Sequence, residues 1–372
     1  MKKRNEKAKQ HAGRALSLRV IADKLGCSRS TVSYALRNQP SISPETRMKV
    51  QRIAKRLGWR PDAEIARMLA LVRASGRRPS PNLAIILNKP LGELAVEHAP
   101  RKHLWGAKQR AADLGYNIET FNLSEQMLSP ARLKGVLRAR GVQGVVYLAT
   151  TGATTTLDPA YMEFGTNFAC GVLGIRYPNP PFHVAIGNLH SSAQLAMKQL
   201  LAMGFRRPGA VFPTGLDRVL AWSFSGGIQA GSLEQPLCDR VPICYVGQTE
   251  NFTPDHSFPE IEKWMQRYSP DVLITIDLRN IHRFLDWRSG RNDPIRICAL
   301  DYHKGFTRDF GVDQRNEAVG AAAVDLVIAQ LHRGEVGIPQ VQRTLQIEGV
   351  WVPEGSLAGK ASSKDPLLFA VQ

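Results

Sequence analysis

The sequence predicts an all-α domain followed by a larger α/β domain built on parallel sheets, in a chain of 372 residues. Two patterns predict this division. Between residues 17 and 60, apolar residues recur three and four positions apart, which is typical of amphipathic helices. From residue 82 onward, short apolar runs alternate with amphipathic segments, which is typical of strand–helix–strand units. The chain is long enough for two or three domains, each with its own core.

The positive charge of the chain is concentrated in the first domain. Residues 1–79 hold 20 of the 49 Lys and Arg residues and 5 of the 32 Asp and Glu residues, a net charge of +15, whereas residues 80–372 carry +2. A basic head on a nearly neutral body predicts a polyanionic partner for the head. Residues 1–16 are too polar to bury a core, so we expect a disordered basic tail there.

The segment Leu18–Asn38 predicts two short helices joined by a tight turn. Apolar residues at helical spacing indicate a first helix over Arg19–Leu25, and Gly26 breaks it. Ser28 suits the N-cap of a second helix, Arg29–Leu36. Two such helices describe a helix-turn-helix, whose second helix lies in the DNA major groove. The spacing alone favours an ordinary helical hairpin, and the surrounding charge reverses this preference in favour of the DNA-binding motif.

A third helix completes the predicted headpiece, residues 17–60. Ser43 would cap it, Pro44 would occupy its first position and Glu45 would complement the helix dipole. We expect it to run to Leu57, with Gly58 ending it.

Residues 61–81 predict a hinge helix and a linker. The helical pattern resumes over Ala63–Arg73 and ends in a segment rich in Gly, Pro and Ser. A helix of about 11 residues between two domains is marginal in water, so its folding can depend on a partner.

Residues 82–355 alternate between strand and helix patterns, and 356–372 form a tail without a leucine heptad. Two lobes with a cleft between them are the natural division for this length, although the pattern alone leaves a single barrel open. The expected strands are 83–87, 116–121, 144–148, 169–173, 184–186, 209–212, 244–246, 272–276, 295–300 and 345–350. The expected helices are 103–114, 130–140, 191–203, 224–230, 258–268, 281–287 and 317–331.

Residues 17–355 resemble the LacI/GalR family of bacterial transcription regulators, most specifically in the head. The resemblance implies a headpiece, a hinge helix and a two-lobed body like the periplasmic sugar-binding proteins, with an effector between the lobes. The head carries the motifs Leu18-(x)3-Ala22-(x)3-Gly26-x-Ser28-(x)2-Thr31-Val32-Ser33, Ser43-Pro44-Glu45-Thr46-Arg47-(x)2-Val50 and Leu57-Gly58-(x)2-Pro61. Weaker matches in the body are Val142–Val146, Met203–Phe205, Pro270–Ile274 and Ile297–Asp301.

The resemblance assigns DNA contacts to the second helix. Arg29 and Ser30 would face base edges. An Arg at this position can bind guanine through two hydrogen bonds. Tyr34 takes a third base-reading position that is usually Arg in the family, which implies a different half-site. The side chains that would contact phosphate are Ser28, Thr31, Ser33 and Asn38.

The hinge departs from the family pattern. The family usually has Pro-Asn-Ala here, whereas this chain has Pro61-Asp62-Ala63. Met68 or Leu69 would wedge into the minor groove and kink the DNA, and the spacing leaves both open.

Effector residues are expected at the carboxyl ends of the strands, where parallel sheets bind ligands. That rule selects Asn88, Asp277 and Asp301, and carboxylates beside an aromatic ring suit a sugar. The resemblance adds Asn188, which replaces an aspartate at the first crossing between the lobes. An Arg that commonly reaches the effector is not evident, and Trp222 occupies its neighbourhood.

No enzyme motif occurs: the chain has no P-loop, no GxSxG and no HExxH, so we expect no catalytic residue, cofactor or metal. The histidines, His103 and His303 among them, are dispersed and are expected to be structural. Five scattered cysteines predict reduced thiols. No apolar run approaches the roughly 18 residues that span a bilayer, and no signal peptide is apparent, so we expect a cytoplasmic protein.

The predicted function is therefore a homodimeric repressor that binds a pseudo-palindromic operator in double-stranded DNA and responds to a sugar. The alternative is a DNA-binding regulator whose body is only a dimerisation platform without an effector. A stand-alone sugar-binding protein fits poorly, because it would need neither the basic head nor cytoplasmic residence.

Overall fold

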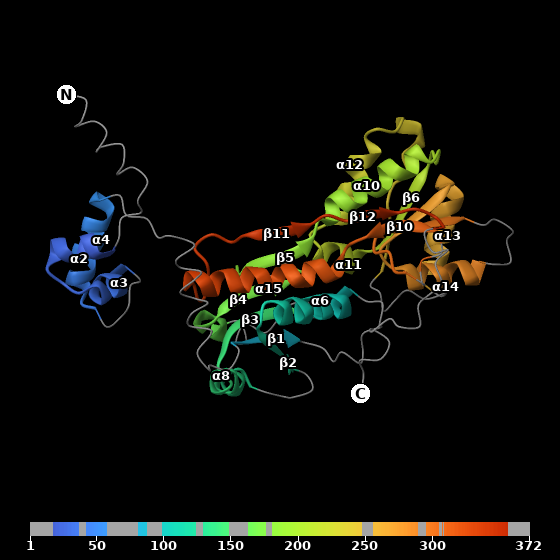
Figure 1. The fold of residues 1–372 in the computed structure, drawn as a ribbon. Coiled ribbons are helices and arrows are strands. Elements are labelled where there is room, and N and C mark those ends of the chain that lie inside the picture. The colour runs from blue at the N-terminus through green and yellow to red at the C-terminus, as the bar shows by residue number, and fades with distance from the viewer. Residues whose placement is uncertain are drawn as a thin grey trace, which may run out of the picture. The chain divides into compact units, whose positions relative to one another are not determined.

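The fold was obtained as a computed structural model (Figure 1). It describes residues 18–36, 42–57, 81–87, 99–123, 129–148, 163–175, 181–247, 256–288, 295–304, 307 and 309–355. The chain divides into two compact units, residues 1–79 and 80–372.

The first unit contains the three predicted helices, α2 (Leu18–Leu25), α3 (Arg29–Leu36) and α4 (Pro44–Arg56). Gly26 adopts a left-handed φ of +62° in the turn between α2 and α3, a conformation that favours glycine. The boundaries agree with the sequence prediction to within one residue. The buried core of this unit consists of Ile21, Ala22, Val32, Ala35, Val50 and Ala54.

The second unit contains two six-stranded sheets, one in each lobe. The first sheet has the order β11-β5-β4-β3-β1-β2 and the second β12-β10-β9-β8-β6-β7. Separate sheets rule out the single barrel. The strands of the first are β1 (Asn82–Leu87), β2 (Asn117–Asn122), β3 (Val142–Leu148), β4 (Ala169–Leu173), β5 (His183–Gly187) and β11 (Thr344–Ile347). Those of the second are β6 (Pro208–Pro213), β7 (Cys244–Val246), β8 (Val272–Thr275), β9 (Arg296–Ala299), β10 (Phe310–Asp313) and β12 (Val350–Val352).

Helices cover the faces of both sheets. In the first lobe these are α6 (Ala99–Asp113), α8 (Pro130–Ala139) and α15 (Asn316–Arg333), with the 3-10 turn η2 (Phe164–Asn167). In the second they are α10 (Leu189–Ala202), α11 (Thr214–Val219), α12 (Ser223–Ser232), η3 (Leu237–Asp239), α13 (Ser257–Tyr268) and α14 (Leu278–Arg288). None of the helices in the described ranges is long and apolar enough to cross a membrane.

Alternation along the strands creates a core on each face of a sheet. In β1, Ile86 packs with Leu133 of α8, whereas Ile85 belongs to the opposite core with residues of α6 and α15. Figure 1 shows α6 and α15 side by side along that second face. Burial on both faces explains why the strands read as continuous apolar runs in the sequence.

One predicted strand is wrong. Residues 345–350 form two strands in different sheets, because the chain passes from one lobe to the other between Ile347 and Val350. A Cβ at Gly349 would lie 2.5 Å from Ser192 Oγ and 2.6 Å from Val312 Cγ1, so any larger residue at this crossing would force these side chains to move. Strand β12 is also antiparallel to β10, whereas we expected parallel sheets. The sequence pattern missed β10 and α11, which are too short to show a period.

The lobes are connected by three chain crossings, and side chains bond the crossings to one another. Asn188 Nδ2 donates to Glu348 Oε1 at 2.6 Å, joining the first crossing to the third. Ser192 Oγ donates to Gln314 Oε1 at 3.0 Å, joining the first to the second.

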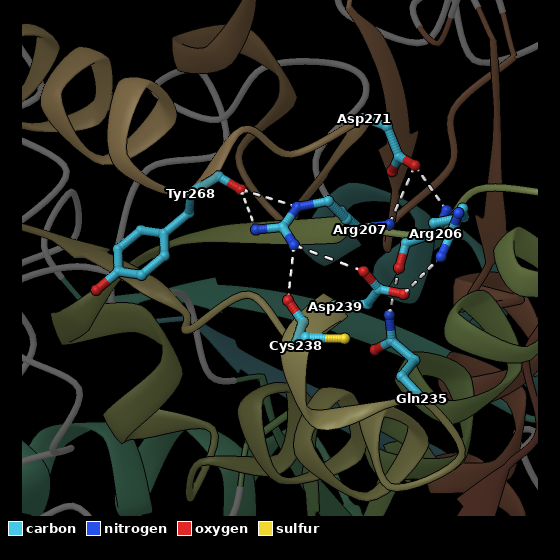
Figure 2. Close-up of polar contacts among 7 residues, drawn as sticks. All are labelled: Arg206, Arg207, Gln235, Cys238, Asp239, Tyr268 and Asp271. Atoms are coloured by element: carbon cyan, nitrogen blue, oxygen red, sulfur yellow. Dashed lines mark hydrogen bonds and ion pairs between the residues drawn. The ribbon is translucent and has the colours of Figure 1, made fainter.

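A polar network holds the amino-terminal end of β6 (Figure 2). The Arg207 guanidinium donates to the carbonyl of Tyr268 at 2.6 and 3.1 Å and lies 3.6 Å from Asp239. The Asp271 carboxylate accepts from the backbone N–H groups of Arg206 and Arg207 at 2.6 and 3.0 Å. The network ties together the turns at the amino-terminal ends of the strands in the second sheet. Ligands are expected at the opposite, carboxyl ends.

Candidate functional site

The start of α3 is fixed by hydroxyl groups. Ser28 Oγ accepts from the backbone N–H of Thr31 at 3.0 Å, which satisfies an orphan donor of the helix. The same oxygen lies 2.8 Å from Thr31 Oγ1 and 3.0 Å from Ser30 Oγ. The first turn of α3 is thus held in place by hydroxyl groups of its own residues and of its N-cap.

The exposed face of α3 carries the predicted DNA-reading residues. Arg29 and Ser30 are exposed and Tyr34 is 45% exposed, while Thr31 and Ser33 are half-buried. Val32 and Ala35 lie on the opposite, buried face. Arg29 and Ser30 lie in the first turn of α3, where a recognition helix contacts base edges, and Tyr34 lies one turn further along the helix. Asn38, Met68, Leu69 and Asn88 lie outside the described residues.

The headpiece surface is positive. Asp23 and Glu45 are the acids among its described residues, and they lie 3.9 Å from Arg19 and 3.0 Å from Lys49 in exposed ion pairs. Such pairs contribute little stability and leave most of the positive charge available. The other exposed basic side chains are Lys24, Arg29, Arg52, Lys55 and Arg56.

Helix α4 begins as the sequence predicts. Ser43 accepts from the backbone N–H of Thr46 at 3.3 Å, with Pro44 at the first helical position and Glu45 in the first turn. The Arg47 guanidinium donates to the Ile42 carbonyl at 3.0 Å, which fixes the approach to this cap.

Asp277 and Asp301 follow the carboxyl ends of the neighbouring strands β8 and β9, as predicted. The Asp277 carboxylate accepts from the side chain of Asn280 at 2.7 Å and from its backbone N–H at 3.3 Å. Asp277 therefore caps the start of α14 in this structure. A ligand would have to share this carboxylate with the cap.

Asp301 is the centre of a polar cluster. Its Oδ1 accepts from Asn316 Nδ2 at 3.0 Å, and its Oδ2 lies 3.1 Å from His303 Nε2. Burial opposes the ionisation of Asp301, but the neighbouring His303 ring, Lys102 and the hydrogen bond from Asn316 together lower its pKa. The His103 ring is directed at the Asn316 side chain, and burial lowers the pKa of His103 to about 4. We call His103, Asp301, His303 and Asn316 the interlobe cluster.

The interlobe cluster draws on both lobes. His103 is on α6 of the first lobe, Asp301 and His303 follow β9 of the second, and Asn316 begins α15 after the second crossing. Sequence reasoning found Asp301 and missed the histidines, because positions 103 and 303 have no motif in common. Only the fold brings them together.

The two other predicted effector residues also have local partners. Asn188 is the N-cap of α10, accepting from the backbone N–H of Ser191 at 3.3 Å. Trp222 is 43% exposed, and its ring meets that of Tyr245 edge to face with centroids 5.8 Å apart. An exposed aromatic pair of this kind can act as a platform for a sugar ring.

Asp217, in α11 close to Trp222, was not predicted. It is 0% exposed, and neither carboxylate oxygen makes a hydrogen bond of ordinary geometry. The carboxyl group is directed toward the hydroxyls of Ser225 and Tyr245, and burial raises its pKa. No sequence signal singled out Asp217, since α11 itself was not foreseen.

Residues 17–62 match the family of bacterial regulatory proteins described as the lacI family. The match covers the headpiece and the residues immediately after it.

Two curated relatives extend the similarity into the body. The sucrose operon repressor of Escherichia coli is 27% identical over 192 residues, which are 52% of this chain and 54% of the repressor. The match therefore spans about half the length of that relative. The HTH-type transcriptional regulator CelR of Thermobifida fusca is 22% identical over 331 residues, covering 85% of this chain and 92% of CelR.

Solved structures agree on the fold. A transcriptional regulator CelR–cellobiose complex and a lac repressor dimer bound to operator and the anti-inducer ONPF each have a TM-score of 0.50 and 18% identity. Each comparison covers 91% of this chain and 98% of the other. The architecture of a helix-turn-helix region and a two-lobed α/β domain with largely parallel sheets is therefore that of the LacI-type repressors.

Proposed function

The chain carries the helix-turn-helix domain of the lacI family on a two-lobed α/β body, and from that premise we propose a sequence-specific regulator of transcription. It binds a pseudo-palindromic operator in double-stranded DNA as a homodimer, because one small headpiece covers too little DNA. The observation that carries the proposal is the exposed, Ser28-capped face of α3 within a headpiece of strongly positive charge.

Two sets of side chains have distinct roles on DNA in this proposal. Arg29, Ser30 and Tyr34 read base edges in the major groove, and Arg29 selects a guanine. Ser28, Thr31, Ser33 and Asn38 position the helix on phosphates. Met68 or Leu69 of the hinge wedges into the minor groove at the centre of the operator.

A small ligand, in our proposal a sugar, controls operator affinity from between the lobes. Asn188, Asp277, Asp301, Trp222 and Asn88 are the proposed contacts, and the similarity to CelR, which was solved with cellobiose, supports this ligand class. The bonded crossings offer a path by which the lobes move together. The expected coupling is about 1–3 kcal/mol.

The proposed mode of action is repression in the cytoplasm, where the operator lies, and it involves no enzymatic step, cofactor or metal. A second function, in which the body only dimerises the headpieces, is favoured by the engagement of Asn188 and Asp277 in helix caps. Thermal unfolding with a sugar panel separates the two functions. A ligand at about 100 times its Kd adds roughly 2.7 kcal/mol to the stability of a sensor and nothing to that of a platform.

Selection of duplexes from a random pool by the purified full chain tests the DNA-binding proposal. Arg29→Ala should relax one defined base preference by about 1–3 kcal/mol in both half-sites. Arg52→Ala, which removes an exposed positive charge from α4, should lower affinity evenly across sequences. Unchanged relative affinities across operator variants for Arg29→Ala would refute the assignment.

A further inference from the structure

We propose that the apolar segment Leu367–Phe369 of the carboxyl-terminal tail binds in a groove between α10 and α12 of the same chain. This interaction is independent of the proposed function, because it takes place within one lobe. The tail, residues 356–372, lies outside the described residues. Its sequence, the point where it leaves the second lobe and the lining of the groove support the assignment.

The groove follows the line along which α10 and α12 meet. The helices approach closely, since a Cβ at Gly231 would lie 2.6 Å from Met197 Cβ, and Figure 1 shows them side by side. The apolar part of its lining comes from Leu195 of α10 and from Ala230 and Gly231 of α12. The exposed polar side chains that border it are Gln194, Lys198 and Glu234. The groove is therefore apolar along its centre and polar along its rim.

The groove opens toward the amino-terminal edge of the second sheet. Contacts of Gly227 with His190 and of Gly231 with Met197 show that α10 and α12 run in the same direction. Helix α10 precedes β6 and α12 precedes β7, and these two strands are parallel. Both helices therefore end near the edge at which the strands begin, and one mouth of the groove lies there.

The tail leaves the second lobe at this same edge. Strand β12 is antiparallel to β10, so it ends where the parallel strands begin. Just beyond it, Glu354 Oε2 lies 2.5 Å from Nη2 of Arg296, the first residue of β9. Trp351 of β12 packs against the core that contains Met197 of α10. The tail thus starts at the edge to which the groove opens, beside the helix that forms one of its walls.

The tether before the apolar segment is long enough to reach the groove. Leu367 lies 12 positions after Gly355, and an extended chain covers about 3.3 Å per residue, which gives about 40 Å. The six strands of the sheet, about 4.8 Å apart, span only about 24 Å. Residues 356–366 are mostly small or polar, whereas residues 367–369 are apolar. The sequence therefore places an apolar segment at the end of a polar spacer.

The charges at the mouth of the groove match those that precede the apolar segment. Lys198 on α10 and Glu234 just after α12 border the groove, and neither forms an ion pair with another described residue. In the tail, Lys364 and Asp365 come shortly before the apolar residues. A tail that enters at the mouth brings Asp365 to Lys198 and Lys364 to Glu234. The apolar side chains then continue toward Leu195, where their removal from water supplies the affinity.

Two substitutions on α12 test the groove. Ala230→Glu puts a carboxylate into the apolar lining, where an unpaired charge is costly to desolvate. Gln229→Glu adds the same charge at the neighbouring exposed position, which does not line the groove, and is the matched control. A charge exchange tests the order of the pairs: Glu234→Lys should weaken the interaction, and Lys364→Glu in the same chain should restore it.

The decisive experiment is photocrosslinking of the full chain with benzoylphenylalanine in place of Phe369. Unlabelled and nitrogen-15-labelled chains are mixed and equilibrated before irradiation, so that mass spectrometry separates links within a chain from links between chains. The expected result is a link from position 369 to α10 or α12 of the same chain. Ala230→Glu should lower its yield at least about fivefold, and Gln229→Glu should leave it unchanged.

Four results would overturn the proposed interaction. They are links to the groove of the other chain, links confined to other elements, a yield no higher than in urea, and equal yields in Ala230→Glu and Gln229→Glu. Links between chains would show that the groove joins two copies instead. Selection of one duplex sequence by the same preparation reports on the proposed function separately, since the tail and the groove take no part in it.

Discussion

In the headpiece the charged side chains lie at the surface, around a small core of six buried apolar residues. In the two-lobed body several titratable side chains lie inside, among them the buried His103, His303 and Asp217. Exposed charges act at long range and are screened by salt. Buried groups act on whatever touches them and respond to pH. The proposed function accounts for this contrast, since it gives the headpiece a large polyanion as its partner and the body a small molecule.

The salt dependence of operator binding gives the largest expected effect. A headpiece pair that makes six to ten phosphate contacts should lose about 10³–10⁵ in affinity between about 50 and 200 mM salt, through counterion release. Ligand binding by the body should change by less than about twofold over the same range, because its polar groups are shielded from ions. Fluorescence anisotropy measures the salt dependence of DNA affinity, and calorimetry measures that of ligand affinity. Equal slopes of log affinity against log salt concentration for DNA and for ligand would contradict the distinction between the headpiece and the body.

Acid should destabilise the body through His103. Its pKa is about 4 in the folded chain and about 6.5 when unfolded, so the unfolded state binds more protons between these values. Stability is complete above about pH 6.5 and falls by up to about 3 kcal/mol as the pH drops to 4. The Asp301 carboxylate, the Asn316 amide and the Lys102 ammonium face this ring.

Urea unfolding at a series of pH values measures this effect in wild type and in His103→Leu. The variant should lose the part of this pH dependence that comes from His103, whereas His332→Gln should keep all of it. His183, whose pKa burial also lowers, contributes the remainder in both variants. The lowered pKa of Asp301 puts its own titration at lower pH, below its ordinary value of 3.8. A variant profile as steep as that of the wild type would show that His103 is not the group responsible.

The contact between α6 and α15 should also be sensitive to a single methyl group. A Cβ at Gly106 would lie 2.0 Å from the carbonyl oxygen of Glu317, so Gly106→Ala forces the helices apart and should cost about 1–3 kcal/mol. Gly135→Ala, on α8 with open space around it, should be neutral or slightly stabilising. Urea unfolding compares them, and equal stabilities would show that the close approach has no energetic consequence.

The smallest effect compares two serine caps. Ser43→Ala in the headpiece and Ser129→Ala at the start of α8 each remove a cap and should each cost about 1 kcal/mol. Because the headpiece core is small, only Ser43→Ala should weaken operator binding measurably at raised temperature. Equal operator affinities for the two variants, from gel-shift titrations, would argue that α4 plays no part in positioning α3.

The headpiece could be predicted almost completely from the sequence. Its caps, Ser28 and Ser43, its turn at Gly26 and its apolar spacing are local signals, and a helix-turn-helix is short enough to be defined by them. The candidate reading residues follow directly, because the first turn of α3 determines which side chains face outward.

The alternation of strands and helices in the body could be predicted from the sequence. The residues that the fold brings together there could not. The crossing at Gly349 depends on contacts with Ser192, 157 positions earlier, and no local pattern announces it. Likewise, His103 becomes a neighbour of Asn316 only through the packing of α6 on α15. Single histidines without a spacing motif carry no signal until the fold brings them together.

The central claim is that paired headpieces recognise one DNA sequence in concert with a neutral body. Sedimentation of the full chain with a selected palindromic duplex and with a scrambled duplex, at physiological salt, tests it most directly. The account predicts two protomers on the palindrome and a preference of at least about 10³ over the scrambled duplex. A single protomer on either duplex, with equal affinities, would contradict it.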